Sequence, residues 1–145
     1  MTNTAIALTQ EQIDFYRREG YLVLPSITTA DELTRLSTIY DRLFAERAGR
    51  AEGNQFDLAG ADEEDAVATL PQILGPSRYA PELKDFLFKR NAKEIAMQLL
   101  GGECTAGEHA ILKPPRYGAA TPWHQDEAYW SPDLEYNSLS IWMPL

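Results

Sequence analysis

The sequence has few of the residue types that define several large classes of protein. Its single cysteine, Cys104, excludes an internal disulfide and a cysteine-based zinc site, and we interpret it as a packed thiol. The 13 lysines and arginines are scattered and are outnumbered by 22 acidic residues, which gives a formal net charge of -9. Nucleic acid or an anionic membrane would require a basic patch, so a small-molecule partner fits better.

Long apolar runs are also missing. No stretch approaches the roughly 20 apolar residues that a membrane-spanning helix needs. The N-terminus has neither the basic start nor the apolar run of a leader peptide. We therefore expect a soluble, cytoplasmic protein. A chain of 145 residues that is 44% hydrophobic buries roughly two thirds of its unfolded surface, which predicts a single domain over residues 1–145.

The first part of the chain carries helix signals. Thr9 and Gln12 form a capping box for a helix over residues 10–19, and Gly20 suits its left-handed end. A strand is predicted over residues 21–24. A second helix should begin after Thr28 or Thr29, with one apolar stripe formed by Leu33, Leu36, Ile39, Leu43 and Phe44.

Residues 48–65 have no apolar period and predict an exposed loop, whose most solvated part is the acidic run Asp62, Glu63, Glu64 and Asp65. Beyond this loop, Pro81 suits the first turn of a third helix. Asn91 and Glu94 are typical of the start of a fourth, which should end at Gly101.

The character of the sequence changes after that glycine. Residues 105–113 show no helical stripe and lead into Pro114 and Pro115, while residues 137–143 largely alternate polar and apolar side chains. Both patterns are typical of strands. Helices followed by strands predict an α+β domain or a β-barrel-like core with an N-terminal helical flank.

The segment TPWHQDE, residues 121–127, contains the strongest candidates for chemistry. His124 and Asp126 are two residues apart, and on a strand such positions face the same side. An imidazole and a carboxylate so placed are two members of the 2-His-1-carboxylate triad of non-haem iron(II), which leaves metal positions open for a co-substrate and dioxygen. The alternative is a surface histidine that happens to lie beside an acid.

Longer strings favour the metal interpretation. HAILKPPRYG, TPWHQD and SIWMPL follow one another in the order and spacing of the phytanoyl-CoA dioxygenase family, and the opening FYRREGYLVLP is similar too. The chain resembles that family over essentially its whole length. The resemblance implies N-terminal helices flanking an incomplete double-stranded β-helix core, a jelly roll of the cupin type. It also implies an iron(II), 2-oxoglutarate-dependent dioxygenase that hydroxylates a small organic substrate.

The resemblance assigns roles to individual residues. His124 and Asp126 match the iron ligands, and Trp142 matches a tryptophan that lines the 2-oxoglutarate pocket. His109 matches a side chain near the co-substrate, and Gln72 matches a polar position that faces the same pocket. Alternatively, Trp142 is plain core and His109 a satisfied interior histidine. Because related iron halogenases replace the carboxylate with a small residue, Asp126 favours hydroxylation over halogenation.

The sequence departs from the family in two respects. The family has a third ligand, a distal histidine, and an arginine that pairs with 2-oxoglutarate, both C-terminal to the His-x-Asp pair. Here no histidine follows His124 and no arginine follows Arg116. Lys113 and Arg116 are candidate cations for the co-substrate carboxylate, although the family uses neither for that role. His109 as the third ligand is another alternative.

A jelly roll also needs about eight strands, more than this sequence supplies, and the chain stops in the apolar run 141–145. An exposed apolar sheet edge invites pairing with another chain. We therefore expect the N-terminal part of a dioxygenase domain, truncated at its C-terminus and inactive alone. The alternatives are a non-catalytic cupin-like small-molecule binding module and an interaction domain built on the N-terminal helices.

Overall fold

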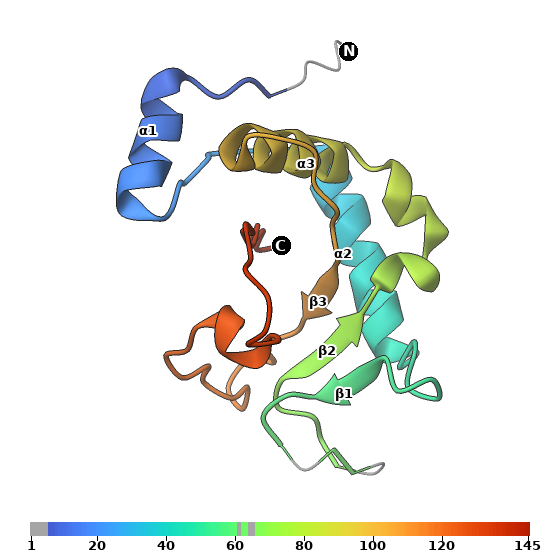
Figure 1. Cartoon of the computed structure of the whole chain (residues 1–145). Coiled ribbons are helices and arrows are strands. Elements are labelled where there is room, and N and C mark those ends of the chain that lie inside the picture. Colours follow the sequence, from blue (N-terminus) through green and yellow to red (C-terminus); the bar gives the residue numbers. More distant parts are fainter. Residues whose placement is uncertain (1–5, 61, 64–65) are drawn as a thin grey trace.

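The computed structural model describes residues 6–60, 62–63 and 66–145, which form an α+β structure. Its α-helices are α1 (Gln10–Glu19), α2 (Ala30–Ala45) and α3 (Leu87–Leu100), and its strands are β1 (Gln55–Asp57), β2 (Pro71–Leu74) and β3 (His109–Ile111). Short 3-10 helices lie at η1 (Pro76–Arg78), η2 (Pro81–Asp85) and η3 (Asp126–Tyr129). The helices and the sheet follow a curve, and the C-terminal end of the chain lies inside it (Figure 1). None of the helices in the described ranges is long and apolar enough to span a membrane.

Helix α1 has the ends that the sequence predicts. The Thr9 hydroxyl accepts a hydrogen bond from the Gln12 amide at 3.2 Å, the Gln12 side chain accepts one from the Thr9 amide at 2.9 Å, and Gly20 is left-handed with φ 80°. The predicted strand over residues 21–24 is wrong, because this segment has no regular structure. The Tyr21 ring packs edge-on against Phe15 at 5.4 Å, so the segment folds back on α1 and does not pair with a strand.

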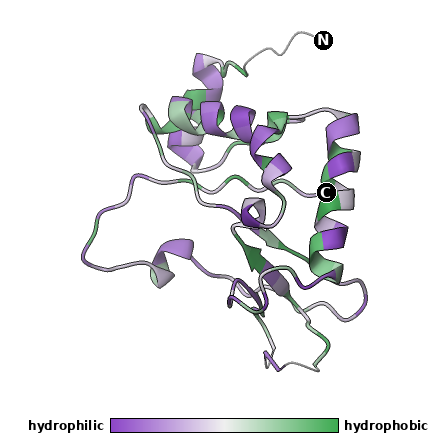
Figure 2. Ribbon diagram, turned by 90° about the vertical axis from the view of Figure 1, so that its right-hand side faces the viewer, coloured by the Kyte–Doolittle hydropathy of each residue, from purple (hydrophilic) through white to green (hydrophobic). Residues whose placement is uncertain are grey.

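Helix α2 supplies much of the core. Thr29 is its N-cap and accepts a hydrogen bond from the Glu32 amide at 3.2 Å. The predicted apolar stripe is confirmed, since its members are buried or pack against the core. The core cluster consists of Leu36, Leu43, Ile73, Ala80, Leu83 and Phe86. Hydrophobic and hydrophilic residues share the surface of the helices, as an amphipathic element requires (Figure 2).

Helix α3 begins earlier than the sequence predicts. Asn91 is not its N-cap but lies inside the helix, where its buried side chain donates to the Ile27 carbonyl at 2.8 Å. The first amides of the helix, Leu87 and Phe88, are instead bound by the carboxylate of Glu32 on α2. The predicted end at Gly101 is confirmed, and this glycine is left-handed with φ 80°. The third predicted helix, at Pro81, is the short η2.

The sheet is antiparallel with the order β1-β2-β3. Gln55 pairs with Ile73, which in turn pairs with Ala110. Strand β1 lies within residues 48–65, where the sequence predicts only a loop, and β3 is shorter than the predicted 105–113. The predicted strand over 137–143 is wrong, because that segment has no regular structure. Strands this short carry too few side chains to show a period of two.

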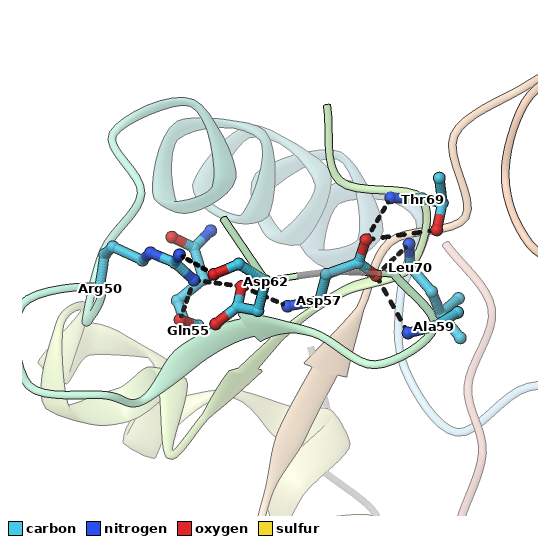
Figure 3. Close-up of polar contacts among 7 residues, drawn as sticks. All are labelled: Arg50, Gln55, Asp57, Ala59, Asp62, Thr69 and Leu70. Carbon is cyan, nitrogen blue, oxygen red and sulfur yellow. Dashed lines mark hydrogen bonds and ion pairs between the residues drawn. The ribbon is translucent and has the colours of Figure 1, made fainter. Parts of the chain in front are cut away.

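A polar cluster closes the connection between β1 and β2 (Figure 3). The buried Asp57 carboxylate accepts hydrogen bonds from the amides of Ala59, Thr69 and Leu70 and from the Thr69 hydroxyl. Asp62 accepts one from the Asp57 amide at 3.0 Å and also contacts the Arg50 guanidinium. Within the predicted acidic run, Asp62 is therefore exposed but engaged, while Glu64 and Asp65 lie outside the described residues.

Candidate metal half-site

The structure brings His124 and Asp126 together. His124 lies in an irregular stretch and Asp126 begins η3, yet Nε2 of the histidine is 3.2 Å from Oδ1 of the aspartate. The predicted strand is absent, but Gln125 between them is extended, with φ -120° and ψ 127°. One extended residue is enough to place its two neighbours on the same side. The arrangement that the spacing predicts is therefore present without the strand.

Each of the two side chains has a second partner on the side away from the other. His124 Nδ1 lies 2.8 Å from the Pro122 carbonyl oxygen, and Asp126 Oδ2 accepts a hydrogen bond from Ser140 Oγ at 3.0 Å. A carbonyl oxygen only accepts, so this contact is a hydrogen bond when Nδ1 carries a proton. In the neutral imidazole, the lone pair of Nε2 is then available to a metal ion.

This donor set fits two adjacent positions on a metal ion. Two ligands at right angles, each about 2.1 Å from the ion, are about 3.0 Å apart, close to the 3.2 Å between Nε2 and Oδ1. The side chains of His124 and Asp126 are 39% and 54% exposed, which leaves space for further ligands. Among the described residues, however, no group of three or more His, Cys, Asp or Glu could hold a metal. The pair is thus a candidate half-site, and in the described part of the chain His109 does not complete it.

The other predicted site residues lie on the sheet and in the C-terminal segment. Gln72 is buried in β2, and His109 starts β3 opposite Leu74. Opposite residues and residues two apart share a sheet face, so Gln72 and His109 lie on one face. His109 is exposed, and Trp142 is 87% exposed. Within these 145 residues, both side chains are therefore open to solvent.

Arg116, one of the two candidate cations, lies in a tight turn that precedes the half-site, and Lys113 comes directly before this turn. The Gly118 amide donates to the Pro114 carbonyl at 2.9 Å, and Arg116 within the turn has a positive φ of 74°. Lys113 donates to the Thr121 hydroxyl at 2.7 Å, so its ammonium group helps to fix the start of the TPWHQDE segment. The segment that contains His124 follows this turn.

Sequence reasoning misses two contributors to the half-site, Ser140 and the carbonyl of Pro122. The carbonyl belongs to the backbone and has no residue signature. Ser140 lies in a string that carries the family resemblance, but the bond to Asp126 spans 14 positions and leaves no trace in local spacing.

The half-site lies apart from two cavities of the structure. One, of about 260 Å³, is lined by Phe44, Arg50, Gln55 and their neighbours, and the other, of about 430 Å³, lies between α1 and residues 21–23. None of the predicted site residues lines either cavity. His124 and Asp126 therefore lie at an open part of the surface and outside both of these cavities.

Comparison with known proteins identifies a family and a solved structure that are similar to this chain. The family model described as phytanoyl-CoA dioxygenase (PhyH) matches residues 16–145. The chain is also similar to the crystal structure of EvdO2 from Micromonospora carbonacea var. aurantiaca complexed with 2-oxoglutarate. That match has 34% identity and a TM-score of 0.65, and it covers 89% of this chain and 53% of EvdO2.

A second crystal structure of EvdO2 gives 34% identity and a TM-score of 0.62, and the match covers 87% of this chain and 51% of EvdO2. The chain thus spans about half the length of the solved protein that it matches. No curated protein matches it.

Proposed function

Because the chain belongs to the phytanoyl-CoA dioxygenase family, we propose that it forms part of the active site of a non-haem iron(II), 2-oxoglutarate-dependent dioxygenase. The whole enzyme would hydroxylate a small organic substrate, and its core would be a jelly roll of which this chain is the N-terminal part. The observation that carries the proposal is the 3.2 Å approach of His124 Nε2 and Asp126 Oδ1. The exposure of both groups supports it, because a metal ion and its remaining ligands need that space.

His124 and Asp126 would hold the iron at two adjacent positions. The contact with the Pro122 carbonyl would leave Nε2 for the metal, and the Asp126 carboxylate would offset part of its positive charge. When bound, the iron supplies the open positions at which a chelating keto acid and dioxygen meet. The presence of a carboxylate at this position favours hydroxylation over halogenation.

We propose Trp142, His109 and Gln72 for the pocket of the co-substrate. Gln72 and His109 share one face of the sheet, and the exposed Trp142 side chain is available to a ligand. The 2-oxoglutarate bound to EvdO2 supports a pocket of this kind.

The third iron ligand and the cation for the far carboxylate of 2-oxoglutarate would come from outside these 145 residues. The only histidines of the sequence are His109 and His124, and in the described part His109 does not join the half-site. On this proposal the chain binds metal through two side chains and has no hydroxylase activity of its own.

Metal binding to the chain tests the proposal. Titration with Co²⁺, a spectroscopic substitute for iron(II), should show binding that His124→Ala and Asp126→Ala each weaken. Loss of an outer-shell partner lowers metal affinity roughly 10- to 100-fold, and loss of a ligand itself should lower it by at least as much. His109→Ala is the matched control, because it removes the other histidine, and its Co²⁺ affinity should equal that of the wild type. Binding that survives His124→Ala contradicts the proposal.

A second measurement separates the enzyme from the alternative of a binding module. That alternative is favoured by the lack of a third metal ligand among the described residues. Calorimetry with 2-oxoglutarate, without oxygen, should show binding only when iron(II) is present if the chain is part of the enzyme. Binding that is independent of metal, and equal in His124→Ala, indicates the non-catalytic module.

A further inference from the structure

Ser140 contacts the candidate half-site, although none of the predicted roles includes it. Its hydroxyl donates to Asp126 Oδ2 at 3.0 Å, while Oδ1 of the same carboxylate lies 3.2 Å from His124 Nε2. We infer that Ser140 is a positioning residue, which holds the Asp126 carboxylate in the orientation that binds the metal. This inference rests on the proposed function of His124 and Asp126.

The carboxylate needs such a partner because it is exposed. The Asp126 side chain is 54% exposed, so without a second contact its oxygens would exchange places by rotation about the last side-chain bond. The bond from Ser140 engages Oδ2 and leaves Oδ1 facing Nε2. Metal-binding carboxylates are commonly held by hydrogen bonds of this outer kind, and their loss weakens metal binding.

The loop after η3 folds on itself and brings Ser140 back to Asp126. The rings of Trp130 and Tyr136 pack at 4.8 Å. The Tyr136 hydroxyl accepts a hydrogen bond from the Ser131 amide at 3.1 Å and donates one to the Ser131 carbonyl at 3.3 Å. These contacts close the loop, so the chain re-enters the neighbourhood of η3 at Ser140.

Two anchors hold the segment that carries Ser140. Before it, the Asn137 side chain donates to the Leu100 carbonyl, at the end of α3, at 3.3 Å. After it, Met143 packs against the core cluster. The position of the serine hydroxyl is therefore set by contacts on both sides.

The hydrogen bond from Ser140 ends on a candidate metal ligand and does not support the backbone of η3. Ser140 donates to a side-chain oxygen of Asp126 and not to a backbone group of η3. Its removal would leave the backbone bonds of η3, such as that from the Trp130 amide to the Glu127 carbonyl, unchanged. The effect that distinguishes a positioning role is therefore on the metal.

Co²⁺ binding to Ser140 variants tests the inference. We expect Ser140→Ala to raise the Co²⁺ dissociation constant about 10-fold and to change the visible spectrum of bound Co²⁺, because the carboxylate is no longer fixed. Ser140→Thr keeps the hydroxyl and should restore both. Ser138→Ala is the matched control, since it removes an exposed hydroxyl from the same segment, and it should behave as the wild type.

The outcomes are distinguishable. An unchanged dissociation constant and spectrum in Ser140→Ala overturn the inference and leave the proposed function intact. An equal loss in Ser138→Ala, or a failure of Ser140→Thr to restore binding, also overturns it, because the effect would then not belong to the hydroxyl. A wild-type chain that shows no His124-dependent Co²⁺ binding overturns the proposed function, and the role of Ser140 with it.

Discussion

The carboxylate of Glu32 accepts a hydrogen bond from the Leu87 amide at 2.7 Å, across 55 positions of sequence. The same carboxylate accepts a second bond from the Phe88 amide at 2.9 Å. The first amides of a helix have no partner within the helix, and a local side chain usually binds them. Here α2 caps α3, and the negative charge lies at the end of α3 where the helix dipole favours it.

Replacing Glu32 with alanine should therefore destabilise the fold. We expect the free energy of unfolding in urea to fall by about 2 kcal/mol, since two partly buried amides lose a charged acceptor. Asp31→Ala is the control, because Asp31 is an exposed acid in the same turn of α2. Equal losses in the two variants would show that the bonds to α3 contribute nothing.

The Asp57 carboxylate should make stability depend on acid pH. Burial alone would raise the pKa of Asp57, but hydrogen bonds from Thr69, Ala59 and Leu70 outweigh it and hold the pKa below its ordinary value of 3.8. Because the pKa is lower in the folded state, the ionised carboxylate stabilises the fold above about pH 4. This stabilisation is lost as the pH falls through the folded pKa.

Asp57→Asn tests this dependence. The amide group cannot accept all the bonds that the carboxylate accepts, so the unfolding free energy at pH 7 should fall by about 2–3 kcal/mol. Between pH 5 and pH 2, roughly the range in which such a carboxylate titrates, the curve of stability against pH should be flatter than that of the wild type. Part of the slope should remain, because hydrogen bonds from Lys89 and Ser77 outweigh burial and lower the pKa of Glu108 as well. A parallel curve would contradict the role of Asp57.

Gly118→Ala should disturb the turn before the half-site. A Cβ atom at this position would lie 2.5 Å from the Pro114 carbonyl oxygen, so the backbone has to shift. We expect a loss of about 1–3 kcal/mol in unfolding free energy and weaker Co²⁺ binding, because the turn leads into His124. Gly107→Ala is the control, since a Cβ there meets nothing within 4 Å, and it should change neither quantity.

The proton of neutral His124 should reside on Nδ1. Both ring nitrogens face an acceptor, but the 2.8 Å contact of Nδ1 with the Pro122 carbonyl is shorter than the 3.2 Å contact of Nε2 with Asp126 Oδ1, which favours the donor at Nδ1. Long-range ¹H–¹⁵N correlation spectra distinguish the two tautomers of a histidine ring, and the signal of His109 provides an internal reference. A His124 ring protonated on Nε2 would mean that the Pro122 carbonyl does not orient it.

The features that sequence predicts well are those encoded by neighbours along the chain. The capping box of Thr9 and Gln12 and the apolar stripe of α2 depend on residues three or four apart, and both are confirmed. The start of α3 is mispredicted because its cap is Glu32, far away in sequence. Strands β1 and β2 are missed because pairing with a partner strand, not their own pattern, defines them.

The half-site also combines features that neighbouring residues encode with features that depend on distant ones. The approach of His124 and Asp126 requires only that Gln125 be extended, so the spacing of the motif predicts it. The bond from Ser140 depends on the closure of a loop, and the exposure of Trp142 depends on what packs around it. Neither follows from a pattern of residue types.

The short span of the His124 and Asp126 pair has a consequence for how the protein is made. A contact between residues two positions apart closes a very short loop, so it loses little chain entropy. We therefore expect it to form early in folding. The three-stranded sheet needs pairing between distant segments and forms more slowly. On the proposed function, a metal ion would meet both ligands before the sheet is assembled, which would make the supply of metal a factor in folding as well as in chemistry.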